Sequence, residues 1–370
     1  MIGNFRRNML LSPSALVAVA ALLLGVTGVL TIASGRFDFP AYPDSLLAKQ
    51  ALFLVSGMIV MFAASAVPFR LYRQYAPVLG AAGVLLLLLL PILGTRANGM
   101  RGWLRFGALS LQPSELMKAP FLLILAVILS KHEKSEFRKF SLSMLWLLLW
   151  IIPVLLQPDF GTAVVYFLTF VLLYFAIGGR LAYLGLPISV GVAAAVWFVL
   201  RHPYALRRLS GFVNPHGDPL GSGWHSLQFE IAIARGHIFG VKLGGAIWSN
   251  NFLPLPYNDS SYATLSETLG FTGGLLVCGA LVLLASSLWR LSRRPQNSDS
   301  RIFITGVMLL LTLQGMIHIS VNLCLLPTTG LTMPFVSYGG SSLFGCFLML
   351  GMALSAGNER ETAPEKDKEK

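Results

Sequence analysis

The sequence predicts an all-α polytopic membrane protein with about ten transmembrane helices, and three observations support this fold class. Of the 370 residues, 55% are hydrophobic and only 12% are charged, and the mean hydropathy is +0.69. A soluble domain of this length does not need so much apolar surface. The apolar residues gather in runs long enough to cross the roughly 30 Å hydrocarbon core of a bilayer. Most charged residues fall between these runs.

About ten apolar stretches meet this length requirement. They cover residues 14–33, 48–67, 75–93, 114–130, 142–157, 160–178, 181–200, 264–289, 302–324 and 334–355. Only the turn Gln157-Pro158-Asp159 divides the fifth stretch from the sixth, so a merger of these two is the alternative that changes the count. An even number of spans places both termini on one side. We therefore predict one transmembrane domain over residues 1–357, with a long outer loop between spans seven and eight at about 201–261, and a short charged tail at 358–370.

The basic residues predict which side of the membrane the termini occupy. Most of them fall on one side of this topology: Arg6, Arg7, Arg70, Arg73, Lys131, Lys134, Arg138, Lys139, Arg180, Arg290, Arg293, Arg294, Arg301 and the lysines of the tail. The positive-inside rule makes that side cytoplasmic. The first apolar run is longer than a typical signal-peptide core and predicts an uncleaved anchor. The formal net charge of +12 thus reflects membrane topology, and we predict no nucleic-acid binding.

Several cations lie on the opposite, outer side, against this bias. They occupy two loops: Arg96, Arg101 and Arg105 follow the third span, and Arg201, Arg207, Arg208, Arg235 and Lys242 lie in the long loop. An anionic ligand is one reason to keep cations there, because guanidinium groups match phosphate oxygens in geometry and charge. The alternative is a set of solvated residues that reach toward lipid headgroups. The number of cations, with few acids beside them, favours an anion site.

The long loop has a pattern of its own. Residues 214–224 carry a series of turn signals, and Leu227–Ala234 is typical of a short amphipathic helix at the membrane interface. Four histidines also lie in the loop: His202, His216, His225 and His237. Their spacing matches no zinc pattern, so we interpret them as hydrogen-bonding residues. The three cysteines lie within apolar runs, at spacings that indicate neither disulfides nor zinc. We therefore assign no metal site.

Two carboxylates follow the long loop, at the start of the eighth span. Asp259 stands at the mouth of this span in a proline-punctuated segment, and Glu267 lies about two helical turns further in, roughly 12 Å away along the helix. Ionisable groups at such depth are expensive, which makes them functional candidates. The alternative is that Asp259 only caps the following helix. From the segment itself the two interpretations are equally supported.

Polar residues interrupt the spans at three other points. Glu115 and Lys118 are three residues apart, so they share a helix face and can pair. Such a buried pair can be a purely structural tie. Asp159 stands where it can cap the sixth span. Ser337 belongs to a segment, 327–342, whose small residues permit close helix packing and whose hydroxyls can line a polar cavity.

Four segments together resemble a known family. They are Gln112-Pro113-Ser114-Glu115, Gln157-Pro158-Asp159-Phe160-Gly161-Thr162, Asn214-Pro215 through Asp218-Pro219-Leu220-Gly221-Ser222-Gly223, and Pro334-Phe335-Val336-Ser337-Tyr338-Gly339-Gly340-Ser341-Ser342. Their order is similar to that in the SEDS proteins (shape, elongation, division and sporulation), which include FtsW, RodA and SpoVE. The resemblance covers nearly the whole chain. The resemblance does not decide between the FtsW and RodA branches of the family. The 214–215 and 329–332 elements favour FtsW, and the short termini favour RodA.

The resemblance implies a peptidoglycan glycosyltransferase that polymerises lipid II at the outer face of the bacterial inner membrane. It implies a class B penicillin-binding protein as partner, with other membrane proteins of the cell-division or elongation machinery. The family's essential outer-face aspartate falls on Asp259, and its embedded Glu and Lys fall on Glu115 and Lys118. Three places depart from the family's pattern: Asn258-Asp259-Ser260, Arg101-Gly102 and Gln228-Phe229.

These residues suit the implied chemistry. We hypothesise that Asp259 is the general base that takes the proton from the 4-hydroxyl of the acceptor sugar, and that the reaction inverts the anomeric carbon. Candidates to stabilise the departing diphosphate are Arg101, Arg207, Arg208 and Lys242, with or without a divalent cation such as Mg²⁺ or Mn²⁺. Supporting roles are expected for Glu115, Lys118, Glu267, Asp159 and Ser337.

Two alternatives belong to other functional classes. A flippase for lipid-linked precursors would also keep charged residues within the membrane, but it would form no glycosidic bond. A catalytically silent scaffold for a penicillin-binding protein would tolerate substitution of Asp259.

Overall fold

The computed structural model describes residues 12–34, 45–97, 100–107, 109–131, 133 and 135–359. Its helices are α2 (Pro13–Ala33), α3 (Ser45–Ala66), α4 (Phe69–Leu93), α5 (Pro113–Leu116), α6 (Lys118–Ser130), α7 (Glu136–Leu156), α8 (Phe160–Ala176), α9 (Leu181–Arg201), α10 (Pro203–Val213), the 3₁₀ turn η1 (Pro215–Gly217), α11 (Trp224–Gly236), α12 (Ile247–Phe252), α13 (Ser261–Ser292), α14 (Ser298–Asn322) and α15 (Gly340–Gly357). Its strands are β1 (Thr95–Ala97), β2 (Met100–Phe106) and β3 (Leu109–Leu111). The predicted cytoplasmic residues Arg6, Arg7 and Lys134, and the tail from residue 360, lie outside the described residues.

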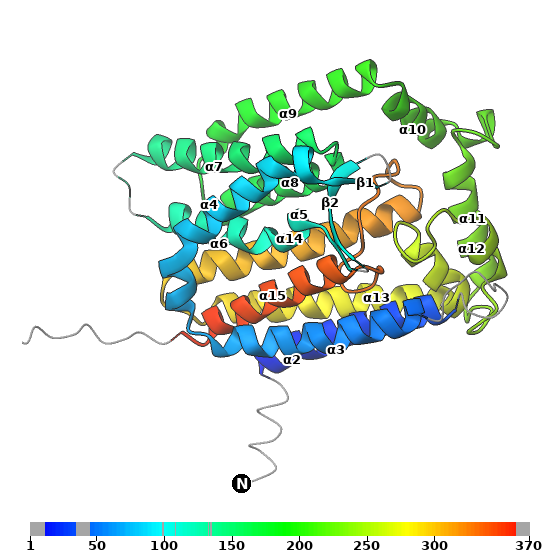
Figure 1. Ribbon diagram of the computed structural model, residues 1–370, viewed down its shortest axis with the longest axis horizontal. Coiled ribbons are helices and arrows are strands. Elements are labelled where there is room, and N and C mark those ends of the chain that lie inside the picture. The colour runs from blue at the N-terminus through cyan, green and yellow to red at the C-terminus, as the bar shows by residue number, and fades with distance from the viewer. Residues whose placement is uncertain are drawn as a thin grey trace, which may run out of the picture.

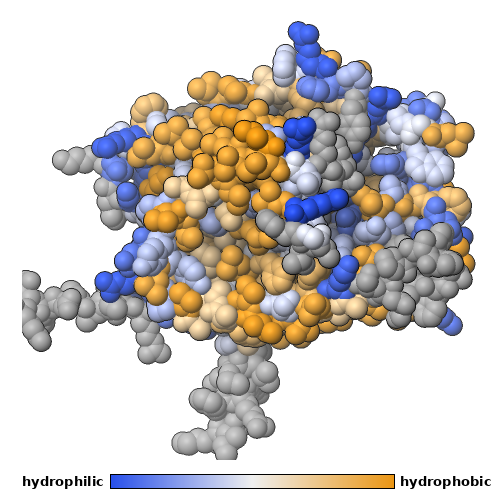
Figure 2. Space-filling view, viewed as in Figure 1, coloured by the Kyte–Doolittle hydropathy of each residue, from blue (hydrophilic) through white to orange (hydrophobic). Residues whose placement is uncertain are grey.

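The membrane-spanning helices lie side by side as one bundle (Figure 1). Among the described residues, 9 helical segments are long and apolar enough to cross a membrane, with α5 and α6 forming one of them, and α8 is a shorter apolar helix. This confirms the predicted all-α polytopic fold. Figure 2 shows apolar side chains over the middle of one face, with hydrophilic ones gathered toward its two ends. Such a surface suits a protein surrounded by lipid.

Three helices near the C-terminus form the centre of the bundle. Helix α15 packs against α3 and α14, while α13 packs against α2 and α14, and α14 also contacts α6 and α8. Their facing side chains, such as Leu265, Phe303 and Phe347, are fully buried. Helix α9 contrasts with them, because Leu184 is its single buried residue. The centre of the bundle is therefore more tightly packed than α9 at its edge.

Helix starts follow local sequence signals. The Ser12 side chain accepts a hydrogen bond from the Ala15 amide, and Pro13 occupies the first helical position of α2. The Asp159 carboxylate accepts from the Thr162 amide and caps α8, as predicted. Arg73, at the start of α4, pairs with Asp299 at the start of α14 and with Glu359 after α15. These ion pairs gather residues from the predicted cytoplasmic side at one end of the bundle.

A small antiparallel sheet, β1-β2-β3, lies between α4 and α5 and was not predicted. Thr95 pairs with Trp103, and Arg105 pairs with Ser110. The signal for it was present, because the Asn98-Gly99 sequence between β1 and β2 is the strongest short hairpin signal. The strands are short and stand between two apolar runs, so hydropathy gives no sign of them.

Helix α13 is broken at Gly270, and the long loop between α9 and α13 supplies hydrogen-bond partners at the break. Gly270 has φ 69° and ψ −162°, a backbone conformation open to glycine. The Glu267 carbonyl accepts from the Val241 amide, and the Phe271 amide donates to the His237 carbonyl. The loop can approach this closely because a Cβ on Gly240 would lie 2.1 Å from the Thr268 carbonyl oxygen. Segment 237–241 is thereby fixed to α13 around Gly270, C-terminal to Asp259 along the chain.

Candidate functional site

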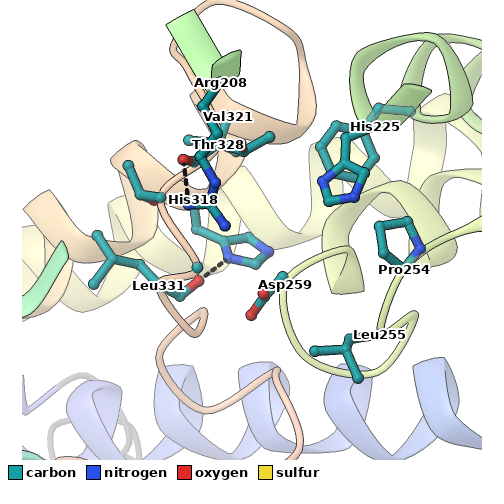
Figure 3. Close-up of a pocket in the computed structure, with 12 residues that line it drawn as sticks. Arg208, His225, Pro254, Leu255, Asp259, His318, Val321, Thr328 and Leu331 are labelled. Carbon is teal, nitrogen blue, oxygen red and sulfur yellow. Dashed lines mark hydrogen bonds between the residues drawn. The ribbon is translucent and has the colours of Figure 1, made fainter. Parts of the chain in front are cut away.

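A cavity of about 170 Å³ opens beside the segment that precedes α13 (Figure 3). It is lined by Arg208, His225, Phe229, Pro254, Leu255, Asp259, His318, Val321, Thr328, Thr329, Gly330 and Leu331. These residues come from α10, α11 and α14, from the loop between α12 and α13, and from the loop between α14 and α15. The volume is below the 300–1,000 Å³ typical of pockets for whole drug-sized ligands. The cavity therefore suits the reacting part of a larger molecule.

Asp259 faces into this cavity and does not cap α13. The residue at the N-cap position is Ser260, and its side chain donates to the Pro254 carbonyl, at 2.6 Å, rather than capping the helix. No donor among the described residues forms a hydrogen bond to the Asp259 carboxylate. Burial raises the pKa of this carboxyl, and the Arg208 guanidinium nearby lowers it. The predicted alternative of a simple helix cap is therefore wrong.

Arg208, one of the cations predicted for the outer loop, lines the cavity. It projects from α10, and its Nη1 donates to the Thr328 carbonyl at 2.9 Å. Figure 3 shows its guanidinium directed into the same space as Asp259. The pKa of His225 is lowered, mainly by burial and secondly by the positive charge of Arg208. The cavity thus has one cation, Arg208, and one carboxylate, Asp259, among its lining residues, and both residues are half-buried.

The other predicted cations lie elsewhere. Arg101 is exposed on β2 and donates from Nη1 to the Pro91 carbonyl at 3.2 Å. Arg207 is exposed on α10, next to Arg208, and Lys242 is exposed in the loop after α11. None of these three lines the cavity. At most they can act on an anion that extends beyond it.

Glu115 and Lys118 form the predicted pair, deep in the bundle. Lys118 Nζ lies 2.6 Å from Glu115 Oε1, and both side chains are almost fully buried. Lys118 also donates to Gln314 Oε1 at 2.9 Å, and Gln314 Nε2 donates to the Thr332 carbonyl at 2.8 Å. The pair does not line the cavity, but through Gln314 it supports the segment that does.

Glu267 has a structural environment. Its carboxylate accepts from the Ser249 amide at 2.7 Å, the Ser249 hydroxyl at 2.5 Å and the Trp248 amide at 3.2 Å. Arg235 Nε, 3.2 Å away, completes the set. The side chain is fully buried. Glu267 therefore holds α11 and α12 against α13.

Ser337 and Asp159 support the site from two sides. Ser337 Oγ accepts from the Met333 amide and donates to the Asn258 carbonyl, both at 2.8 Å. It therefore contacts the residue that precedes Asp259. Asp159 caps α8 and accepts from Gln112 Nε2 at 3.3 Å, away from the cavity.

The sequence analysis missed three residues of α14: Gln314, His318 and Asn322. They recur at intervals of four, so they share one helix face. His318 lines the cavity, and Asn322 Nδ2 donates to the Asp259 carbonyl at 3.0 Å. Their spacing within an apolar run was the signal, because polar residues inside a span mark buried contacts.

Within the described residues, no three His, Cys, Asp or Glu side chains gather in a set that could hold a metal ion. A divalent cation carried in with the diphosphate of a substrate stays a prediction.

Comparison with protein families matches residues 14–362 to the FtsW, RodA and SpoVE family of cell cycle proteins. The probable peptidoglycan glycosyltransferase FtsW of Coxiella burnetii is 35% identical over 362 residues, which cover 95% of this chain and 97% of that protein. The stage V sporulation protein E of Bacillus subtilis is 35% identical over 357 residues, with 93% and 96% covered.

Solved structures share the fold. A chain from a peptidoglycan synthase complex that coordinates polymerization and crosslinking has a TM-score of 0.77 at 29% identity, covering 94% of this chain and 98% of its own length. The crystal structure of the rod shape determining protein RodA of Thermus thermophilus has a TM-score of 0.68 at 26% identity, with 93% and 95% covered.

Proposed function

The chain belongs to the FtsW, RodA and SpoVE family of cell cycle proteins, and from this premise we propose how it works as a peptidoglycan glycosyltransferase. It is a multi-pass membrane protein that polymerises glycan strands in cell division or elongation. Our proposal is that lipid II is the substrate and that Asp259 is the general base. The observation that carries it is the half-buried Asp259 carboxylate, which lines a cavity beside Arg208 and accepts no hydrogen bond from the described residues.

The environment of Asp259 suits a proton acceptor. A carboxylate whose oxygens already accept several hydrogen bonds has few lone pairs left for a substrate, whereas that of Asp259 is open to a hydroxyl in the cavity. Burial raises its pKa, which makes the ionised form a better base than an ordinary carboxylate. Arg208 acts in the opposite direction and helps to keep it ionised. We propose that Asp259 takes the proton of the acceptor sugar's 4-hydroxyl as that oxygen attacks the anomeric carbon.

The diphosphate leaves as this bond forms. One carboxylate and a good leaving group require no covalent intermediate, so we propose inversion at the anomeric carbon. Arg208 is the cation placed to stabilise the negative charge that grows on the diphosphate. The exposed cations Arg101, Arg207 and Lys242 would act further out, drawing the anionic lipid to the surface.

We also propose an orientation and a partner. The positive-inside rule supports cytoplasmic termini, and with that orientation Asp259 would lie at the outer face. The structural relative from a peptidoglycan synthase complex supports a partner that crosslinks the strands. We propose that this partner is a class B penicillin-binding protein, within the cell-division or elongation machinery.

Polymerisation of purified lipid II in detergent tests the proposal. The wild-type protein, assayed with and without its partner, should produce glycan strands without any membrane compartment. Asp259→Ala should produce none while keeping the wild-type melting temperature. A flippase would make no strands under these conditions, and a scaffold would be indifferent to the substitution. Strand synthesis by Asp259→Ala at the wild-type rate would remove Asp259 from the mechanism.

A further inference from the structure

His318 is a buried residue of α14 whose two ring nitrogens both have partners. Its side chain is 1% exposed and lines the cavity next to Asp259 (Figure 3). Nδ1 lies 2.7 Å from the Leu331 carbonyl oxygen, which can only accept, so Nδ1 carries the hydrogen. In the neutral ring Nε2 is therefore an acceptor, and the Ser261 hydroxyl, 3.1 Å away, donates to it. The surroundings thus set one tautomer and one ring orientation.

The contact with Ser261 continues as a chain of hydroxyls. Ser261 Oγ lies 2.8 Å from Ser337 Oγ, and Ser337 Oγ lies 2.8 Å from the Asn258 carbonyl oxygen. The single hydrogen of the Ser337 hydroxyl is shared between these two acceptors. This series of hydrogen bonds runs from His318 through Ser261 and Ser337 to the Asn258 carbonyl. It therefore contacts the backbone on both sides of Asp259, since Asn258 precedes it and Ser261 follows it by two residues.

A second residue of α14, Asn322, also bonds to the backbone around Asp259. Asn322, one turn beyond His318, accepts from the Ala263 amide through Oδ1 and donates to the Asp259 carbonyl through Nδ2, both at 3.0 Å. The backbone from 258 to 263 is thus held at several points by α14 and by Ser337. Among the described residues, no donor bonds to the carboxylate of Asp259 itself. Its direction into the cavity is therefore set by the backbone that carries it.

We propose that His318 is a positioning residue for the general base. It acts through Ser261 and Ser337, and together with the Leu331 carbonyl it joins the cavity loop 328–331 to the segment that presents Asp259. It need not touch substrate. The inference rests on the proposed function of Asp259. A base must be held within about 0.5 Å of its productive place, and an error of about 1 Å can cost roughly 100-fold in rate.

Two substitutions of His318 separate its two contacts. His318→Asn places an amide nitrogen near the position of Nδ1, so it can keep the bond to the Leu331 carbonyl and loses the one to Ser261. His318→Gln reaches the position of Nε2 and keeps the contact with Ser261. Ser261→Ala cuts the chain while leaving His318 in place. Ser286→Ala is the matched control, because this serine lies on α13 like Ser261 and, within the described residues, its hydroxyl bonds only to the Leu283 carbonyl, at 3.1 Å.

Steady-state kinetics of lipid II polymerisation decide the matter, with melting temperature measured on each variant. We expect Ser261→Ala and His318→Asn to lower kcat about tenfold or more, with KM within twofold and melting temperature near that of wild type. His318→Gln should retain most of kcat, and Ser286→Ala should match wild type.

Two results would overturn the inference. One is a kcat within twofold of wild type for both Ser261→Ala and His318→Asn. The other is a loss that only follows the fraction of folded protein, which would assign His318 to stability. Wild-type protein that makes no strands would instead overturn the proposed function itself, so the two failures are distinguishable.

Discussion

Two carboxylates of the α13 region, Asp259 and Glu267, lie eight residues apart and have opposite environments. Glu267 is fully buried and accepts from Ser249, Trp248 and Arg235. Asp259 is half-buried, no donor among the described residues bonds to its carboxylate, and the cavity opens in front of it. The two acids therefore differ in exposure and in whether their oxygens already accept hydrogen bonds. The proposed function makes the acid with open oxygens the reactive one.

The Glu115–Lys118 pair extends the comparison to the interior of the helix bundle. Glu115, on α5, pairs with Lys118 at the start of α6, and Lys118 also donates to Gln314. Glu115 Oε1 is paired with Lys118, while Glu115 Oε2 is buried and has no hydrogen-bond partner among the described residues. Of these acids, Asp259 is the one that lines the cavity. Substitutions at and around these acids separate effects on stability from effects on turnover.

The largest effect on stability should come from Lys118→Ala. It leaves the Glu115 carboxylate buried without its cation, and breaking such a pair costs about 3–5 kcal/mol. Thermal unfolding in detergent checks this. Lys139→Ala is the control, because Lys139 forms a pair of the same spacing with Glu136, at 3.3 Å near the surface. That pair should contribute about 0–1 kcal/mol. Equal melting temperatures for the two variants would contradict the account.

Glu267→Ala should destabilise the protein somewhat less. It leaves the buried Ser249 amide and hydroxyl without an acceptor, which costs about 1–3 kcal/mol for an unsatisfied buried group. Turnover per folded molecule should stay within a few-fold of wild type, because Glu267 does not face the cavity. Melting temperature and active fraction, measured on the same sample, test this. Loss of all turnover in fully folded protein would place Glu267 in the chemistry.

Arg208→Gln should shift the pH dependence of kcat/KM. The rate falls as pH drops through the pKa of Asp259, because the protonated acid cannot accept a proton. Arg208 lowers that pKa, so its removal raises the pKa further and moves the acid limb to higher pH. We also expect a loss of about tenfold in kcat/KM on the plateau from weaker binding of the diphosphate. An acid limb that stays in place would show that Asp259 and Arg208 are not coupled.

The smallest effect should come from Lys242→Ala. This exposed residue lies outside the cavity and acts on substrate through its charge. We expect kcat to stay unchanged and KM to rise about twofold at low salt, with the difference vanishing at high ionic strength. A salt series of initial rates measures this. A loss of kcat would bring Lys242 into the reacting site.

The sequence predicted the spans, the long loop before α13, the Glu115–Lys118 pair and the cap by Asp159, since hydropathy and local spacing determine these features. Asp259 stood out because a carboxylate at the mouth of a span is rare. Arg208 could not be separated from Arg207, because which of two adjacent cations faces a cavity depends on how α10 lies. His318 was missed because its role arises from contacts with Ser261 and Leu331, which only the fold brings together.

The most direct test of the open-acid account is the single-turnover rate of polymerisation by Asp259→Asn. This variant keeps the size of the side chain and removes only its ability to accept the proton. We predict a loss of at least about 1,000-fold in rate, with lipid II binding and melting temperature unchanged. Glu267→Gln, measured in parallel, should stay within a few-fold of wild type. An Asp259→Asn rate within tenfold of wild type would contradict the central claim.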